Sequence, residues 1–377
     1  MEVDLIKKLI KESKRQIRKR LEFVDFRQNS PGGRDQFVPN EKGWAFWKSN
    51  SSFISIHTRP KKVQDIEFTP RRPDPIEAQT AIIIQGKLLL DEDFTLETVR
   101  IYKKMFPLSP LIVSTWIGSD MDTIEAIRLT GAEVLLNEDL LEPGLGNIMR
   151  QICSTSAGLQ RARELSCTHA VKTRTDWRMM RPSAVENLHA LLRLFPRHTT
   201  DGSRSERIIA SSTATLKHRV YGLTDIFHFG AIADLLKYWA PYIEQKDTCI
   251  NLTSPPTIIR GSPIISEIYL CARYLENLGI TLDFTLEQWW DSLRKHFIVV
   301  DNAMLDALWR RHAHVFEYRF THSYALRGPR ALDHLDWLQL MATQNVNWDY
   351  AGFQETWTYN VNPGVQGKGG EIIRVSI

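Results

Sequence analysis

The sequence predicts an α/β fold built around a mostly parallel β-sheet flanked by helices. Three observations support this prediction. The chain has 377 residues, of which 43% are hydrophobic, and this is enough to bury a sizeable core. Residues 81–84 form a short apolar run closed by Gln85 and Gly86, which is typical of a strand buried on both faces. From residue 80 onward such runs alternate with segments of helical periodicity, and this order predicts right-handed crossovers between parallel strands.

The first half of the predicted core is regular. Its strands are expected at residues 81–84, 111–116, 133–136 and 168–172, and its helices at 95–106, 120–129 and 147–165. The second half is less regular: strands are expected at 207–210, 224–229 and 297–301, and helices at 230–239 and 263–279. The last hundred residues are rich in tryptophan, and residues 360–370 are expected to form a mobile tail.

The chain is expected to have three parts. Residues 60–75 are rich in proline and charge, which suits a linker or an extended segment. We therefore predict an N-terminal basic helix and extended segment at 1–75, a catalytic domain at 76–310, and an aromatic-rich C-terminal extension at 311–377.

The composition favours a cytoplasmic protein. No apolar stretch is long enough to span a bilayer, and the N-terminus lacks the apolar core of a secretory signal. The four cysteines show no CxxC spacing, which favours reduced thiols over a disulfide framework or a zinc site. The net charge is only +4 and no basic and aromatic stripe is present, so nucleic acid is not an expected partner.

The N-terminal segment is an exception to this balanced charge. Between Lys7 and Arg20, eight lysines or arginines accompany a single acid, Glu12, and apolar residues recur at roughly helical spacing. A basic amphipathic helix at residues 1–20 would bind an anionic membrane surface, making the protein peripheral at the inner face of the cytoplasmic membrane. The alternative is a solvated helix whose narrow apolar face packs on the rest of the protein.

Polar residues follow the predicted parallel strands at the points where they end. Because ligands of open parallel sheets bind beyond the carboxyl ends of the strands, four successive strands ending this way predict a site. Each residue taken singly could be an ordinary strand-ending residue. The residues concerned are Gln85, Gly86, Ser114, Thr115, Trp116, Asn137, Asp139, Arg174 and Asp176.

The segment KTRTDWR at residues 172–178 carries the most chemical information. A carboxylate among cations at the end of a strand suits a nucleotide diphosphate: Asp176 could hold Mg²⁺ or Mn²⁺ against the phosphates, while Lys172 and Arg174 neutralise them. The alternative is a buried salt-bridge cluster that joins strand to helix.

This segment belongs to a series of motifs: IIIQGKL at 82–88, ETVRIYKKMFP at 97–107, LIVSTWIGSD at 111–120, NIMRQICSTSAGLQRA at 147–162, TDIFHFG at 224–230 and FIVVDN at 297–302. In this order they resemble the WavE-type lipopolysaccharide synthesis family, over residues 80 to about 310. The resemblance implies a glycosyltransferase of the GT-A-like fold, in which a nucleotide-sugar lies over a Rossmann-like sheet.

The resemblance also implies roles for individual residues. In the GT-A class a DxD motif ends the fourth strand and binds metal and diphosphate. Here the matching residues are Arg174-Thr175-Asp176, so only the second carboxylate is present and dependence on a metal is in doubt. The expected nucleotide-binding residues are Gln85, Gly86, Thr115 and Asn137 at the strand ends, Lys172, Arg174 and Asp176, and Asn147, Arg150 and Gln151 on one helix. The last three could equally face the sheet.

An inverting transferase needs a general base on the acceptor side, and three residues are candidates. Asp225 and His228 lie in an expected strand whose period of two would put them on opposite faces. Glu267 lies near the start of an otherwise apolar helix, where it could instead serve the helix terminus. A retaining mechanism would need no such base, and the sequence does not decide between the two.

The function expected is therefore transfer of a sugar from a nucleotide-sugar donor to a glycan or glycolipid acceptor, in the synthesis of lipopolysaccharide or capsule. Transfer of a phosphorylated group from a CDP-linked donor could use the same charged cluster. A third possibility is a non-catalytic carbohydrate-binding protein whose C-terminal aromatic side chains stack on sugars.

Overall fold

The computed structural model describes the strands at residues 36–39, 44–48 and 53–57, and residues 60–66, 68, 72–141, 143, 147–197, 205–239, 266–310 and 332–343. The chain divides into two compact units, residues 1–60 and 61–377. The domain boundaries predicted after residues 75 and 310 stay predictions. The basic segment at 1–20 and the tail at 360–370 lie outside the described residues.

The first unit contains an antiparallel sheet of three strands, β1 (Gln36–Pro39), β2 (Trp44–Lys48) and β3 (Phe53–His57). β2 is the central strand, with Gln36 opposite Lys48 on one side and Trp44 opposite His57 on the other. β2 contains three aromatic residues and β3 contains two isoleucines, residue types that are common in strands.

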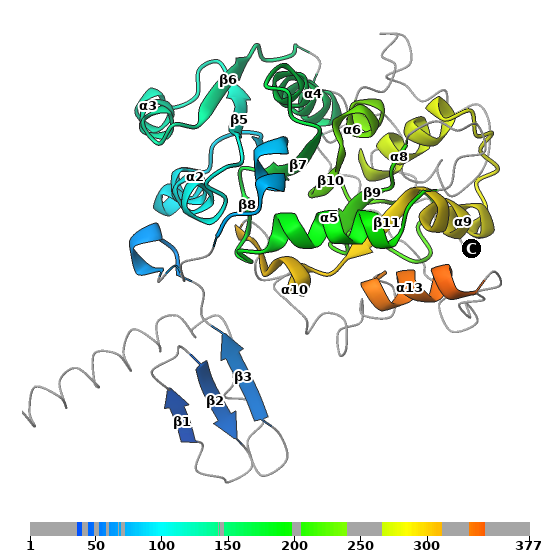
Figure 1. Cartoon of the computed structure of the whole chain (residues 1–377), viewed down its shortest axis with the longest axis horizontal. Coiled ribbons are helices and arrows are strands. Elements are labelled where there is room, and N and C mark those ends of the chain that lie inside the picture. Colours follow the sequence, from blue (N-terminus) through cyan, green and yellow to red (C-terminus); the bar gives the residue numbers. More distant parts are fainter. Residues whose placement is uncertain are drawn as a thin grey trace, which may run out of the picture. The chain divides into compact units, whose positions relative to one another are not determined.

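The second unit is built on a sheet of seven strands in the order β11-β9-β10-β7-β4-β5-β6 (Figure 1). The strands are β4 (Thr80–Gln85), β5 (Leu111–Trp116), β6 (Glu133–Asn137), β7 (His169–Arg174), β9 (Ile208–Ser211), β10 (His228–Ala231) and β11 (Phe297–Val300). β4 pairs in parallel with β5 and β7, β5 with β6, and β9 with β11. Only β10, among the described strands of this sheet, is antiparallel to its neighbours. The predicted mostly parallel α/β sheet is therefore confirmed.

Helices cover the sheet on both faces. α2 (Phe94–Met105) and α3 (Met121–Leu129) pack on each other, while α4 (Ile148–Glu164) crosses β4 to β7 and contacts α6 (Ile232–Trp239) (Figure 1). The crossover from β6 to β7 reverses the direction in which strands are added, and α4 covers the opposite face from α2 and α3 for that reason. The other described helices of this unit with at least eight residues are α5 (Ala184–Leu194), α8 (Ser266–Asn277), α9 (Leu286–His296) and α13 (His334–Ala342).

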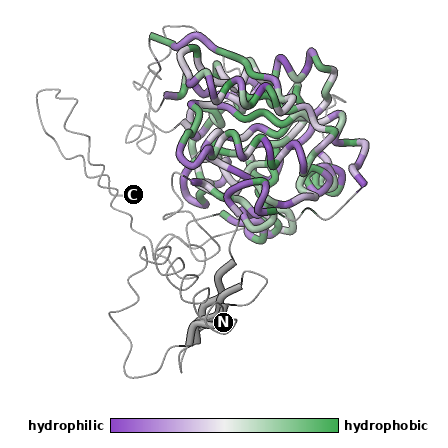
Figure 2. The backbone as a smooth tube through the Cα atoms, turned by 90° about the vertical axis from the view of Figure 1, so that its left-hand side faces the viewer, coloured by the Kyte–Doolittle hydropathy of each residue, from purple (hydrophilic) through white to green (hydrophobic). Residues whose placement is uncertain are grey.

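The core is centred on β4, all of whose residues are buried. Figure 2 shows this layer of hydrophobic strands inside a more hydrophilic surround. α4 approaches β4 closely because it presents Gly158 to the strand: a Cβ atom there would lie only 2.5 Å from Cγ2 of Ile83. The spacing between helix and sheet thus depends on a missing side chain.

The strand expected at 224–229 is wrong at its start. β10 begins at His228, and the preceding residues form a turn in which the Thr215 hydroxyl accepts from the Thr224 amide at 3.2 Å and the Thr224 hydroxyl accepts from the Ile226 amide at 3.2 Å. These side-chain bonds compete with strand pairing. The prediction that Asp225 and His228 occupy opposite faces of one strand therefore fails, because Asp225 lies before it.

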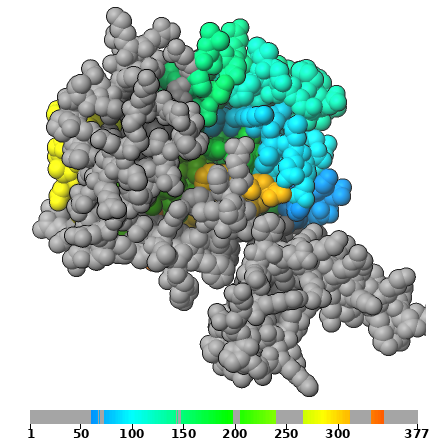
Figure 3. Space-filling model, turned by 180° about the vertical axis from the view of Figure 1, so that it is seen from behind, coloured from blue at the N-terminus to red at the C-terminus, as the bar shows by residue number. Residues whose placement is uncertain are grey.

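A small second sheet brings a late segment of the chain to the carboxyl edge of the main one. β12 (Ala307–Trp309) pairs antiparallel with β8 (Trp177–Met179), so that Trp309 is opposite Trp177. The following residue, Arg310, forms an ion pair of 2.7 Å with Asp91 in the segment between β4 and α2. Figure 3 shows the end of this late segment, in orange, beside the cyan segment between β4 and α2.

Three of the tryptophans in the last hundred residues are core residues. Trp289 and Trp337 are fully buried and Trp290 is 8% exposed. The indole of Trp337 donates to the carbonyl of Phe297 at 2.9 Å and so ties α13 to β11. These side chains stabilise the fold and do not form a surface on which sugars could stack.

Candidate functional site

The parallel strands bring the predicted strand-end residues to one edge of the sheet. In the register, Gln85 pairs with both Ser114 and Arg174, and Trp116 pairs with Asn137. Because all four strands point the same way, their carboxyl ends lie side by side. The strand-end residues that the sequence predicted to lie close together are therefore neighbours in the structure.

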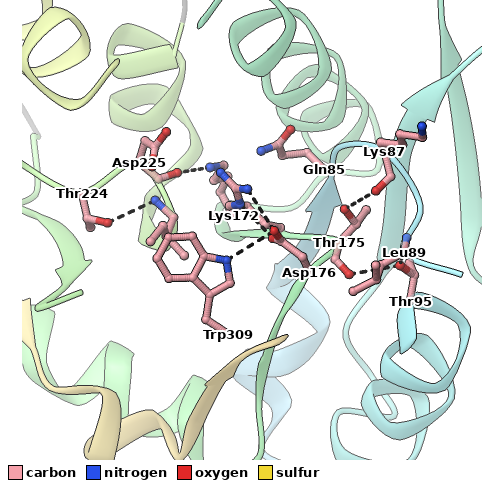
Figure 4. Close-up of polar contacts among 12 residues, drawn as sticks. Gln85, Lys87, Leu89, Thr95, Lys172, Thr175, Asp176, Thr224, Asp225 and Trp309 are labelled. Carbon is pink, nitrogen blue, oxygen red and sulfur yellow. Dashed lines mark hydrogen bonds and ion pairs between the residues drawn. The ribbon is translucent and has the colours of Figure 1, made fainter. Parts of the chain in front are cut away.

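The centre of this edge is an ion pair between Arg174 and Asp176, of which Asp176 is labelled in Figure 4. The guanidinium donates through Nε to Oδ1 at 2.9 Å and through a terminal nitrogen to Oδ2 at 3.0 Å. The indole of Trp309 donates to Oδ2 of Asp176 at 3.3 Å, and its ring lies 5.7 Å from Cζ of Arg174. Burial alone lowers the pKa of Arg174, but the hydrogen bonds and charge of Asp176 raise it above its ordinary value, so the side chain is a permanent cation.

Hydrogen bonds join the segment after β4 to Thr175, which lies between Arg174 and Asp176. Gly86 adopts a φ of +121°, and a Cβ atom there would lie 3.1 Å from the Thr175 hydroxyl. That hydroxyl donates to the carbonyl of Lys87 at 2.6 Å, and the Thr95 hydroxyl donates to the carbonyl of Thr175 at 3.0 Å. Gly86 is required because a side chain would separate the two segments and because few other residues adopt this φ.

The reversed direction of β10 brings Asp225 to the same edge. His228 is opposite Lys172 in the register, so the residues before β10 lie beyond the carboxyl end of β7. The ammonium group of Lys172 donates to the backbone carbonyl of Asp225 (Figure 4) and lies 4.1 Å from the centre of the Trp239 ring. Burial lowers the pKa of Lys172 to about 7, against the opposing charge of Asp225. Lys172 is fully buried, so it supports the Asp225 turn from inside the protein.

Glu267 joins this group from the first turn of α8. Its carboxylate lies 3.7 Å from a terminal nitrogen of Arg219, and its side chain is 18% exposed. Burial, reinforced by the charge of Asp225 and opposed by that of Arg219, raises the pKa of Glu267 to about 7. The Asp225 carboxylate accepts no hydrogen bond from the described residues, although the residue is only 7% exposed. Asp225 and Glu267 are therefore an interacting pair of acids, in which Glu267 holds its proton up to about pH 7.

His228 lies in the interior next to this pair. It is fully buried, and its Nδ1 accepts from the indole of Trp239 at 3.2 Å. Burial, reinforced by the charge of Lys172, holds the pKa of His228 well below its ordinary value of 6.5. The side chain is therefore neutral and contacts the core around Trp239.

The outer strand ends make local hydrogen bonds. The Asn137 amide donates to the Ser114 hydroxyl at 3.0 Å and to the Thr115 carbonyl at 2.7 Å. The Thr115 hydroxyl shares a hydrogen bond of 3.1 Å with Ser119, and the Gln85 side chain accepts from Ser154 at 2.9 Å. These hydrogen bonds hold the carboxyl ends of β4, β5 and β6 in place.

The start of α4 lies beside the residues that follow β6. Arg150 donates to both oxygens of Asp139, at 2.6 and 2.8 Å, and to the side chain of Asn147 at 2.9 Å. Asn147 has a φ of +59° and precedes the helix. The side-chain oxygen of Gln151 is buried and has no partner among the described residues. Of these three residues, Gln151 alone has a buried side-chain atom without a partner in the described part of the chain.

A divalent cation at Asp176, such as Mg²⁺ or Mn²⁺, fits these residues poorly. Both carboxylate oxygens already accept from Arg174, and a guanidinium at this distance repels a second cation. Within the described parts of the chain, no three His, Cys, Asp or Glu side chains are grouped as ligands of a metal ion. We therefore assign no chemical step to a metal.

Two residues of the site are absent from the sequence predictions, Arg219 and Trp309. Arg219 lies in the irregular segment between β9 and β10, where no periodicity indicates which side chains face the edge. Trp309 was one of many tryptophans near the C-terminus, and only its pairing through β12 with β8 reveals its contact with Asp176. Aromatic residues beside a charged motif were the available signal.

A family model described as WavE lipopolysaccharide synthesis matches residues 81–347. No curated protein matches the chain. Similar solved structures include glucosyl-3-phosphoglycerate synthase from Mycobacterium tuberculosis in complex with Mn²⁺, UDP and phosphoglyceric acid, at 15% identity over 56% of this chain and 86% of that chain, with a TM-score of 0.29.

Two further structures are a cytidylyltransferase from Leptospira borgpetersenii (13% identity, 70% of this chain and 94% of that chain, TM-score 0.32) and core-mannan synthase A from Aspergillus fumigatus in an Mn/GDP form (10% identity, 70% and 86%, TM-score 0.26). At these identities and TM-scores the likenesses carry no argument about activity.

Proposed function

Since the chain belongs to the WavE lipopolysaccharide synthesis family, we propose that it is a glycosyltransferase. It moves a sugar from a nucleotide-sugar donor to a growing bacterial surface polysaccharide, either lipopolysaccharide or capsule. The observation that carries this proposal is the single charged edge on which Arg174 and Asp176 meet Asp225 and Glu267. Cations suit the donor diphosphate, and a carboxylate pair beside them suits acid–base chemistry on an acceptor.

In the proposed step, the Glu267 carboxylate accepts the proton of the acceptor hydroxyl. The acceptor oxygen then forms a bond to the anomeric carbon of the donor sugar, while the bond from that carbon to the diphosphate oxygen breaks. The nucleoside diphosphate leaves with the electron pair, and the nearby guanidinium of Arg174 stabilises its negative charge. The products are the extended glycan and a nucleoside diphosphate.

The environment of Glu267 supports its role as the base. A base works best when its pKa lies near the working pH, and burial with the charge of Asp225 raises that of Glu267 to about 7. Asp225 is better suited to accept a hydrogen bond from a sugar hydroxyl, because its own carboxylate accepts none from the described residues. His228 is buried behind them and has no direct role in this scheme.

The other two functions predict different products. Transfer of a phosphorylated group from a CDP-linked donor would release CMP, whereas sugar transfer from a nucleoside diphosphate sugar releases the diphosphate. A non-catalytic carbohydrate-binding protein would release neither. The burial of Trp289 and Trp337 weakens this last alternative, because it depended on exposed aromatic side chains.

Association with a membrane would depend on residues 1–20. Among the described residues, no helix is both long and apolar enough to cross a bilayer. Attraction of the basic N-terminal segment to anionic lipid would hold the enzyme near a glycolipid acceptor.

The proposal is tested by incubating the full-length protein with UDP-, GDP-, CMP- and CDP-linked donors and measuring the nucleotide released. We expect slow release of a nucleoside diphosphate from one sugar class even without acceptor. Glu267→Gln should lower turnover with acceptor by roughly 10² to 10⁴, with little change in nucleotide affinity. Glu276→Gln is the matched control, because Glu276 lies on the same helix but pairs at the surface with Arg273.

Two results would contradict the proposal. Release of CMP from a CDP-linked donor would favour transfer of a phosphorylated group. A protein that binds no nucleotide and releases none would favour the carbohydrate-binding alternative.

A further inference from the structure

Asp176 is poorly placed to act as a metal ligand because its carboxylate is already occupied. It accepts two hydrogen bonds from Arg174 and one from Trp309, and only 4% of its side chain is exposed, compared with 21% of that of Arg174. The group that a ligand meets first is therefore the guanidinium. Trp309 restricts Arg174 further, because its ring lies 5.7 Å from the guanidinium carbon.

A second guanidinium faces the same group of acids. Arg219 donates to the backbone carbonyl of Ala214 and lies 3.7 Å from Glu267, while its Nε has no partner among the described residues. The charges of Arg219 and Arg174 both act to lower the pKa of Glu267, against the effect of burial. Gly222 makes room for Arg219, since a Cβ atom there would lie 2.3 Å from its Nε.

We infer that Arg174 and Arg219 hold the donor diphosphate in place of a divalent metal ion, with Asp176 and Trp309 positioning Arg174. This inference rests on the proposed function. Two planar guanidinium groups match the charge of a diphosphate and can bind its oxygens in pairs, which a compact ammonium group cannot do. Asp176 is then a positioning residue: it orients the guanidinium that contacts the phosphate.

The first experiment needs no variant. Binding of UDP, GDP and CDP to the full-length protein is measured by calorimetry in EDTA, and again with millimolar Mg²⁺ or Mn²⁺. We expect at least one diphosphate to bind in EDTA, with a change of less than about threefold on adding metal. A diphosphate that binds at least tenfold more tightly with metal would overturn the inference and leave the proposed function standing. Absence of binding under both conditions would overturn the proposed function itself.

The second experiment separates the arginines from general charge effects. Arg174→Gln and Arg219→Gln should each weaken diphosphate binding in EDTA by roughly tenfold to a hundredfold, as expected for loss of a charge-assisted hydrogen bond. Binding of the matching nucleoside, which lacks phosphates, should not change, and this also shows that each variant is folded. Arg161→Gln is the control, because Arg161 pairs with Glu133 and Glu164 near the end of α4 far from this edge.

Arg174→Lys tests the paired geometry. It keeps a positive charge but lacks the planar fork, so diphosphate affinity should fall while nucleoside affinity is retained. If Arg174→Gln and Arg219→Gln bind the diphosphate as tightly as the natural protein does, the two arginines do not hold it.

Discussion

Replacing Glu267 with glutamine should stabilise the protein above pH 7 while it lowers turnover with acceptor. Glutamine has nearly the same shape as glutamate but carries no charge at any pH. In the folded protein the Glu267 carboxylate is mostly buried and has Asp225 as a neighbour, so ionisation is unfavourable there. The change removes this unfavourable charge together with the proposed base.

The size of the effect follows from the pKa values. Burial and the charge of Asp225 raise the pKa of Glu267 from its ordinary value of 4.5 to about 7. Below pH 4.5 both the folded and the unfolded states hold the proton, and the favourable contribution to folding is fully present. As the pH rises through 7 the unfolded chain has lost its proton first, and this contribution disappears. At about 1.4 kcal/mol per pH unit, the loss amounts to about 3 kcal/mol.

The assay is chemical denaturation of both proteins at pH 5 and at pH 8. The free energy of unfolding of Glu267→Gln, relative to the natural protein, should be greater at pH 8 than at pH 5 by about 2 to 3 kcal/mol. Comparing the two proteins cancels the contribution of other titrating groups, such as Lys172. Glu276→Gln is the control for the substitution itself, because Glu276 lies on the same helix and is 43% exposed. If the difference for Glu267→Gln does not vary with pH, the carboxylate does not titrate near neutrality and the argument for its role as base is lost.

Three further predictions concern the site, the core and the N-terminus. Asp225→Asn should move the acidic limb of the kcat profile below pH 7 by roughly one pH unit, because the like charge that raises the pKa of Glu267 is removed; an unmoved limb would contradict this coupling. Gly158→Ala should lower stability in thermal denaturation by about 1 to 3 kcal/mol, because the new methyl group collides with Ile83; an unchanged melting temperature would mean that helix and strand separate freely. Deleting residues 1–20 should reduce binding to anionic vesicles and leave turnover of a soluble acceptor nearly unchanged; a misfolded product would instead identify the segment as part of the packed structure.

The parallel half of the sheet can be predicted from sequence because its strands are short, wholly apolar runs. Ile82, Ile83 and Ile84 are all fully buried, as a strand covered on both faces requires. Since parallel strands end at one edge, the proximity of Gln85 and Arg174 follows from the order of elements alone. Local patterns and one topological rule are therefore enough to predict this half of the sheet.

The part of the edge around Asp225 and Glu267 could not be predicted in the same way. The segment before β10 has the composition of a strand, but hydrogen bonds from Thr215 and Thr224 hold it as a turn. Whether a strand is parallel or antiparallel depends on strands that are distant in the sequence. The local sequence of β10 therefore does not indicate its direction. Arg219 and Trp309 reach the site through loops and a three-residue strand, so no periodicity identifies them.

The reversal of β10 also has a consequence for protein synthesis. The four strands from β4 to β7 pair only in parallel with one another, and the Arg174 and Asp176 pair lies at the end of β7, so this part of the edge is synthesised early in translation. Asp225 arrives with the segment before β10, and Glu267 arrives later with α8. A nascent or truncated chain that ends before Glu267 therefore lacks the base. If the proposed function is correct, such a chain would not transfer a sugar to an acceptor.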